Sequence, residues 1–275
     1  MKGIAFGQYY PAKSVMHRLD PRMKIIIGIL YIVACFLCKN VISFALLAFS
    51  AILIILISRI PLKIVLKSIK AIIFIMIFTA ILNIFWTKGD AEELLFSWKF
   101  INIYVSGLYN AAFIVIRIIS MIIGTGIFLT YTTTPIQLTD GLEQLLSPLK
   151  VFKIPVHEFA MMMTIALRFI PTIIEETEKI MAAQKARGAD FSSGSLAKRA
   201  KALIPVLIPL FISAFRRAGE LATAMTCRCY RGGEGRTRLN VLKFSFRDFA
   251  ALFVILAFGA GIVIINIFAP GYTMN

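Results

Sequence analysis

The sequence predicts an all-α polytopic membrane protein, with about five transmembrane helices and two or three long amphipathic cytoplasmic coupling helices. Hydrophobic residues make up 59% of the 275 residues and charged residues only 16%, whereas soluble domains carry about 25% charged residues. The mean hydropathy is +0.84, and the apolar residues are concentrated in long runs. Runs of roughly 17–25 apolar residues are typical of membrane-spanning helices.

Five apolar runs are predicted to cross the membrane. Four belong to an N-terminal membrane part, residues 1–131, and the fifth to a C-terminal part, residues 248–275. The first run is short for a span, so its limits are expected to extend into Arg22–Lys24. The predicted spans are residues 25–38, 41–57, 71–86, 104–131 and 250–269.

Lysine and arginine residues gather on one side of these spans, within a formal net charge of +16. Nine lie before the first span or between the second and third, and seventeen lie in residues 132–247. Only Lys39, Lys88 and Lys99 fall on the opposite side. Because basic loops stay in the cytoplasm, the N-terminus and residues 132–247 are expected there, and the C-terminus outside. Since the charge follows topology, we expect contact with membrane lipid and no nucleic acid partner.

Helices with clear start and stop signals are predicted within residues 132–247. Residues 134–137 have the Thr-x-x-Gln capping pattern, with proline at the first helical position. A second helix is expected over residues 155–187, with Gly188 as a typical stop, and a third over about residues 195–230. Both long helices are amphipathic, too charged to span easily and too apolar to stay in water. We expect them to lie along the membrane surface or to pack on one another.

Four short motifs point to one family. Leu19-Asp20-Pro21-Arg22-Met23-Lys24 precedes the first span, and the second cytoplasmic helix contains Leu167-Arg168-Phe169-Ile170-Pro171 and ends with Gln184-Lys185-Ala186-Arg187-Gly188. These residues resemble the N-terminal signature and the Ala-Arg-Gly coupling helix of the transmembrane (T) subunit of energy-coupling factor vitamin transporters. A second Ala-Arg-Gly motif of that family corresponds here to Cys227-Arg228-Cys229-Tyr230. This departure keeps the arginine and its small neighbours.

The resemblance implies a subunit without enzymatic activity in the plasma membrane of a prokaryote. In the family, two cytoplasmic ABC ATPase subunits dock on the ends of two coupling helices, and a membrane-embedded substrate-binding (S) component carries a vitamin or metal. ATP is bound by the partner subunits, so no cofactor and no metal are expected on this chain. The implied docking residues are Arg187 with Ala186 and Gly188, and Arg228 with Cys227 and Cys229.

Physical chemistry agrees with a docking role for these arginines. The guanidinium group is permanently charged, and its planar fork can bind a carboxylate through two hydrogen bonds. Either arginine alone could simply complement the dipole at a helix C-terminus. Two arginines at the ends of two successive helices, within the family pattern, favour docking.

Three other features allow more than one interpretation. Arg117 lies near the middle of the fourth span, where a charge is a functional candidate. It is expected to pair with a partner carboxylate or backbone carbonyls, or to join helices across a polar seam. Cys35 and Cys38 lie in an apolar helix, where ordinary packing is expected. Near Cys227 and Cys229 no histidine or further cysteine occurs, which disfavours a metal site.

Two other classes of membrane protein remain open. An ordinary ABC permease with its own translocation path would bind substrate by itself and would need only one short coupling helix in place of residues 132–247. A lipid-modifying membrane enzyme could hold head groups with Arg117 and the basic face, but it would need a catalytic cluster at the interface. No Ser/His/Asp set, metal-ligand set or Gly-x-x-x-x-Gly-Lys-Ser/Thr phosphate loop is legible. The resemblance, together with these absences, therefore favours an ATP-driven transport subunit that leaves ATP hydrolysis to partners.

Overall fold

The computed structural model describes residues 9–86, 94–98, 101–191, 195–232 and 242–268. These residues are overwhelmingly helical, which confirms the all-α membrane fold class. The chain divides into two compact units. Unit 1 comprises residues 1–141 and 242–275, and unit 2 comprises residues 142–241.

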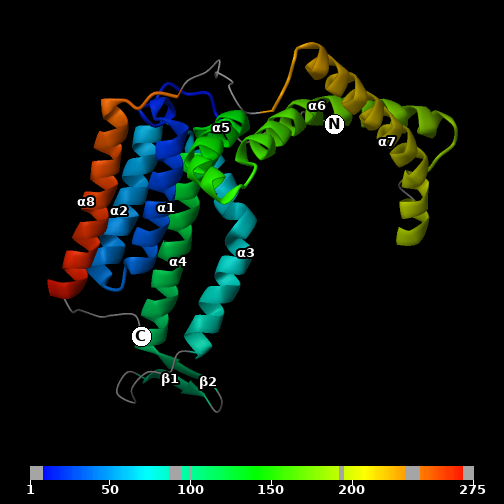
Figure 1. The fold of residues 1–275 in the computed structure, drawn as a ribbon. Coiled ribbons are helices and arrows are strands. Elements are labelled where there is room, and N and C mark those ends of the chain that lie inside the picture. The colour runs from blue at the N-terminus through cyan, green and yellow to red at the C-terminus, as the bar shows by residue number, and fades with distance from the viewer. Residues whose placement is uncertain (1–8, 87–93, 99–100, 192–194, 233–241, 269–275) are drawn as a thin grey trace. The chain divides into compact units, whose positions relative to one another are not determined.

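Unit 1 is a bundle of five long helices (Figure 1). A short 3-10 helix, η1 (Met16–Arg18), precedes α1, and a π-helical turn, η3 (Gly126–Tyr131), continues α4. The strands β1 (Leu94–Trp98) and β2 (Ile101–Tyr104) form an antiparallel hairpin between α3 and α4. The five helices are α1 (Pro21–Leu37), α2 (Val41–Ser58), α3 (Leu62–Trp86), α4 (Val105–Thr125) and α8 (Phe246–Phe268).

Helix α1 forms the centre of this bundle. Its Tyr31, Cys35 and C-terminal Cys38 are fully buried. The Tyr31 ring stacks on a phenylalanine of α8 and meets Phe128 of η3 edge to face. A Cβ atom on Gly124 of α4 would overlap the Tyr31 ring, so the close approach of α4 to α1 requires glycine there. The packing role expected for Cys35 and Cys38 agrees with this burial.

Helix α3 begins nine residues before the corresponding predicted span. Lys63, Lys67 and Lys70, expected to lie in a loop, instead occupy its first turns and are exposed. Their spacing places them on one face of the helix. Lysine can reach the membrane surface along its apolar stem, so a basic start is compatible with a membrane helix.

Six helices in the described ranges are long and apolar enough to cross a membrane, which supports a multi-pass membrane protein. Four of them, α2, α3, α4 with η3, and α8, correspond to predicted spans. The other two are α6 and α7, which the charge pattern places on the cytoplasmic side, whereas α1, with 17 residues, is not among the six. Which helices cross the membrane therefore stays a prediction, as do the division at residues 131 and 247 and the cytoplasmic N-terminus.

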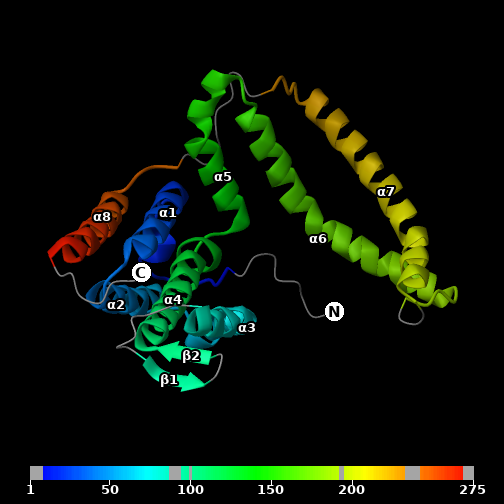
Figure 2. The same ribbon diagram turned by 90° about the horizontal axis from the view of Figure 1, so that it is seen from below.

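Unit 2 is built on two long helices. Helix α5 (Pro135–Leu145) leads out of unit 1, and η4 (Ser147–Phe152) connects it to α6 (Val156–Ala186). Helix α7 (Leu196–Cys227) runs back in roughly the opposite direction, at an angle to α6 (Figures 1 and 2). Both long helices lie within a few residues of their predicted limits. They contain internal prolines, at Pro171 in α6 and at Pro205 and Pro209 in α7.

Candidate functional site

The C-terminus of α6 ends in a complete glycine cap. Arg187 occupies the C-cap position, and Gly188 follows in the left-handed region with φ 89°. The Gly188 amide donates to the Lys185 carbonyl at 2.9 Å, and the Ala189 amide donates to the Gln184 carbonyl at 3.0 Å. This pair of hydrogen bonds is the Schellman arrangement, which satisfies the free carbonyls of a helix end. The cap fixes where the Arg187 side chain leaves the helix.

The C-terminus of α7 has the same cap with different residues. Arg228 occupies the C-cap position, and Cys229 follows in the left-handed region with φ 55°. The Cys229 amide donates to the Thr226 carbonyl at 2.9 Å, and the Tyr230 amide donates to the Met225 carbonyl at 3.0 Å. Cys229 therefore stands where glycine stands in α6. The altered motif Cys-Arg-Cys produces the same backbone geometry as Ala-Arg-Gly.

Both arginines are exposed, together with the small residues that flank them. Ala186, Gly188, Cys227 and Cys229 are each exposed as well. Within the described part of the chain, neither guanidinium group makes a side-chain hydrogen bond or an ion pair. Two open guanidinium forks on rigid caps are chemically suited to bind carboxylates of other proteins.

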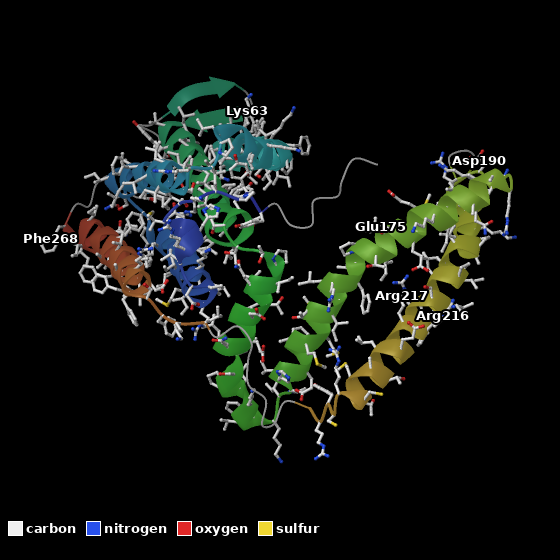
Figure 3. The ribbon with its side chains drawn as sticks, turned by 90° about the horizontal axis from the view of Figure 1, so that it is seen from above. Lys63, Glu175, Asp190, Arg216, Arg217 and Phe268 are labelled. Atoms are coloured by element: carbon white, nitrogen blue, oxygen red, sulfur yellow. The ribbon has the colours of Figure 1, made fainter. Side chains whose placement is uncertain are left out.

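An ion pair joins the two helices between these ends. Arg217 of α7 donates from Nη2 to Glu176 Oε2 of α6 at 2.9 Å, and Figure 3 shows Arg217 in the space between the helices. Arg187 lies eleven residues beyond Glu176, and Arg228 lies eleven residues beyond Arg217. Eleven helical residues rise about 16 Å. Because α7 runs in roughly the opposite direction to α6, the two arginines lie on opposite sides of the ion pair, each about 16 Å from it along its own helix.

A cavity of about 480 Å³ lies between α6 and α7 around this ion pair. Apart from Glu176 and Arg217, its walls are apolar, and they include Phe169 of α6 and Phe211 of α7. Phe211, Ile212 and other large apolar residues of α7 are exposed. The helix pair therefore carries an apolar surface in addition to its charged ends.

The predicted N-terminal motif forms the first turn of α1. The Asp20 side chain caps the helix by accepting from the Arg22 amide at 2.9 Å, and Pro21 occupies the first helical position. The Arg22 guanidinium donates to both Asp20 oxygens, each at 3.1 Å, and to the Leu242 carbonyl at 2.9 Å. It also lies 4.0 Å from the centre of the Phe244 ring. The motif thus ties the start of α1 to the chain segment that precedes α8.

Two charged residues that were not predicted as site residues complete this cluster. Lys24 is buried, and its Nζ donates to the Thr132 carbonyl at 2.8 Å. Asp248 is buried at the start of α8 and accepts from the Asp20 amide at 2.8 Å and from the Ser245 amide at 2.7 Å. Buried charges are stable only when they are paired and hydrogen-bonded. A single acid at the start of the last apolar run was the available signal for Asp248.

Arg117 holds the turn between α1 and α2. It donates from Nη2 to the Cys38 carbonyl at 2.8 Å, and its guanidinium lies 5.3 Å from the centre of the Phe44 ring. Asn266 of α8 binds the same turn by donating to the Leu37 carbonyl at 2.6 Å. Of the interpretations that the sequence left open for Arg117, these contacts favour backbone carbonyls and a polar seam between helices.

The predicted site residues thus lie at four places on different elements of the chain. The two arginine motifs lie at the two ends of the α6–α7 pair, the N-terminal motif lies at the start of α1, and Arg117 lies in the bundle. Among the described residues, no group of three or more His, Cys, Asp or Glu side chains could hold a metal ion. Glu176 and its ion pair with Arg217 were missed, because its partner is 41 residues away in sequence.

Comparison with known proteins gives a consistent result. A family model described as cobalt transport protein, CbiQ, matches residues 12–239. The chain is 52% identical to the energy-coupling factor transporter transmembrane protein EcfT of Clostridium kluyveri over 251 residues, which is 91% of this chain and 92% of that relative. The protein of the same name from Ruminiclostridium cellulolyticum is 50% identical over 97% of this chain and 98% of its own length. That from Bacillus subtilis is 46% identical over 94% and 97%, respectively.

Proposed function

The chain belongs to the CbiQ family of cobalt transport proteins, and from this membership we propose that it is the transmembrane coupling subunit of an energy-coupling factor importer. In this proposal two cytoplasmic ABC ATPase subunits bind the helix ends at Arg187 and Arg228, with the flanking residues of both motifs at the contact. A membrane-embedded S component brings the vitamin or metal. This chain links ATP hydrolysis to release of that cargo.

The observation that carries the proposal is the matched pair of arginine caps. Arg187 and Arg228 both occupy the C-cap position, each is followed by a residue in the left-handed region, and both ends have the same two capping hydrogen bonds. They are also equally spaced from the Glu176–Arg217 ion pair. Two similar ATPase subunits related by an approximate two-fold axis would each meet an equivalent arginine. An arrangement with one docking point would not need this repetition.

Each docking contact is proposed to be an arginine fork in a groove of one ATPase. Losing one partner of a desolvated, hydrogen-bonded charge pair weakens an interface by about 2–5 kcal/mol. Lysine keeps the charge but not the planar fork. The exposed small residues beside each arginine, Ala186 with Gly188 and Cys227 with Cys229, allow a partner surface to approach closely.

The apolar surface of the α6–α7 pair is the proposed platform for the S component. Movement of the ATPases would shift the two arginine ends, and the platform would pass this movement to the S component, which then releases its cargo. ATP stays on the ATPases, so the chain binds no cofactor and catalyses no reaction of its own. In this proposal the N-terminus and unit 2 lie in the cytoplasm, a location supported by the positive charge of residues 132–247.

The test is a double substitution, Arg187→Lys with Arg228→Lys, in the chain co-expressed with its ATPases and S components. Because lysine keeps the charge and the helix ends, the variant should insert normally but lose about tenfold or more of the ATPase bound. Co-purification of the ATPases measures this loss. Arg216→Lys changes another exposed arginine of α7 and is the matched control, which should bind the ATPases normally. Unchanged ATPase binding in the double variant would refute the docking assignment.

An ordinary ABC permease is the competing function. It would bind cargo in the absence of an S component, whereas the coupling subunit would not. Purified chain with ATPases alone, tested for binding of radiolabelled riboflavin and cobalt(II), separates the two. Saturable binding of either tracer would favour the permease.

A further inference from the structure

The first turn of α1 holds both places where the chain passes between unit 1 and unit 2. Gly141 is the last residue of unit 1 before the chain enters unit 2, and Leu242 is the first residue after it returns. We call Pro21, Arg22 and Lys24 the collar, because Pro21 lies against Gly141, Arg22 binds Leu242, and Lys24 binds Thr132 just before α5.

Two contacts of the collar hold the outgoing chain. A Cβ atom built on Gly141 would lie 3.1 Å from the Pro21 Cβ atom and 3.3 Å from the Pro21 carbonyl carbon, so α5 approaches the start of α1 nearly backbone to backbone. Nine residues earlier, Lys24 donates to the Thr132 carbonyl at the end of η3. The outgoing chain is therefore held on both sides of the start of α5.

The returning chain is held by Arg22. Its guanidinium donates to the Leu242 carbonyl and lies over the Phe244 ring, while two further hydrogen bonds to Asp20 fix its orientation. The Arg22 and Asp20 side chains are only 14% and 2% exposed. Solvent therefore competes little for these bonds, which makes the contact rigid.

Asp248 joins the two passages. It accepts from the Asp20 amide, directly before the collar, and from the Ser245 amide, directly before α8. The starts of the first and last long helices of unit 1 are thus connected through one buried carboxylate. A displacement of either passage would have to break charge-assisted hydrogen bonds, which are stronger than neutral ones.

We propose that the collar is a coupling element: it keeps both passages rigid, so that movement of unit 2 reaches the membrane bundle instead of being lost in bending of the chain. The inference rests on the proposed function, because it presupposes ATP-driven movement of unit 2. Its residues are positioning residues, since they lie in unit 1 and bind neither ATPase nor cargo in this account. The Asp-Pro-Arg motif would thus help to transmit movement of unit 2 to the membrane bundle.

The test uses the complete complex with its ATPases and S components in proteoliposomes. Phe244→Leu removes the ring under Arg22 and leaves the charge pair with Asp20 in place. Arg22→Lys keeps the charge and removes the fork. Phe246→Leu is the matched control, because Phe246 is 86% exposed and has no ring contact in the described residues. Uptake of radiolabelled riboflavin and cobalt(II) is divided by ATP hydrolysed.

For Phe244→Leu and Arg22→Lys we expect normal ATPase binding, normal ATP hydrolysis and a fall of about fivefold in uptake per ATP. The Phe246→Leu complex should match the wild type. A role limited to stability would instead lower assembly, hydrolysis and uptake together and leave uptake per ATP unchanged, and that result overturns the proposal. Absence of ATPases from the wild-type complex would contradict the proposed function itself, which is a different outcome.

A measurement on the wild type decides the matter if the variants fail to fold. Amide hydrogen exchange of residues 132–138 and 242–248 should change by less than about twofold when a non-hydrolysable ATP analogue is added. Amides of Arg187–Ala189 should change more, because that end of α6 meets an ATPase. Larger changes at the two passages than at the helix end would show that the passages are hinges and would overturn the collar.

Discussion

The cap of α6 and the interior of α7 predict opposite effects for a glycine-to-alanine substitution. Gly188 has φ 89°, and Gly219 lies inside α7, yet a Cβ atom at either position would meet nothing within 4 Å. Any effect must therefore come from the backbone and not from collision. The left-handed conformation costs an L-residue about 1–2 kcal/mol, so Gly188→Ala should destabilise the last turn of α6 by about 1 kcal/mol. Gly219→Ala should stabilise α7 by about 1 kcal/mol, because alanine is the better helix former.

The same reasoning predicts a stabilising substitution at the C-terminal cap of α7. Cys229 is a non-glycine residue with φ 55°, so Cys229→Gly should stabilise the last turn of α7 by about 1 kcal/mol. Amide hydrogen exchange of the detergent-solubilised chain reads local opening at each helix end. An effect of 1 kcal/mol changes the exchange rate about fivefold. We expect faster exchange at Ala189 in Gly188→Ala and slower exchange at Tyr230 in Cys229→Gly.

The directions of these three effects together test the geometry of both helix ends. If Gly188→Ala and Gly219→Ala change protection in the same direction, the left-handed cap does not control the end of α6. If Cys229→Gly weakens protection at Tyr230, the two caps are not equivalent. Either result would remove the geometric basis for treating Arg187 and Arg228 as a matched pair.

Two further predictions concern the helix pair and the bundle. Glu176→Arg and Arg217→Glu should each reduce ATPase co-purification, and the double variant with the two charges exchanged should recover it. Because both side chains are partly exposed, the ion pair itself adds no more than about 1 kcal/mol of stability. A double variant that binds no more ATPase than the single variants would contradict a role of this ion pair in positioning the two helices. Gly124→Ala should lower the free energy of unfolding by about 1–3 kcal/mol through overlap with the Tyr31 ring, as measured by thermal denaturation in detergent. Gly259→Ala is the control: it has open space around it and should not destabilise the protein. Equal stability of the two variants would contradict the close packing of Gly124 on Tyr31.

Local signals in the sequence predicted the limits of α5, α6 and α7 well. Proline at position 155 and glycine at 188 bracket α6, and Ser195 caps α7 by accepting from the Lys198 amide. Thr134 and Gln137 form the reciprocal capping box that their spacing predicts. Each of these signals acts within four residues along the chain, so one sequence contains all the information needed.

Long-range contacts could not be predicted in the same way. Lys24 and Thr132 are 108 residues apart, and Asp20 and Asp248 are 228 residues apart. Only the packing of α1 against η3 and α8 brings them together. The apolar run of residues 71–86 also begins nine residues after the start of α3, because charge alone does not distinguish a loop from the first turn of a helix.

The equivalence of the two arginine motifs could be predicted only in part from the sequence. The resemblance to a family pointed to Arg228, although its cysteine neighbours depart from the expected motif. Composition gives no reason for a cysteine at a left-handed position, since glycine is preferred there. The backbone geometry of Cys229 supplied the missing link to Gly188.

Photo-crosslinking from the two helix ends tests the central claim most directly. Cys227 and Cys229 are exposed and accept a thiol-linked photoprobe, whereas Cys35 and Cys38 are buried. The end of α6 is probed through Ala186→Cys in a chain whose two exposed cysteines are replaced by serine.

In the complete complex, the account predicts that each helix end captures an ATPase subunit. A probe at Phe268, at the C-terminal end of α8 (Figure 3), should capture none, because the proposed topology puts that end outside the cell. Failure of either helix end to capture an ATPase, or capture from Phe268, would contradict the docking of two ATPases on Arg187 and Arg228.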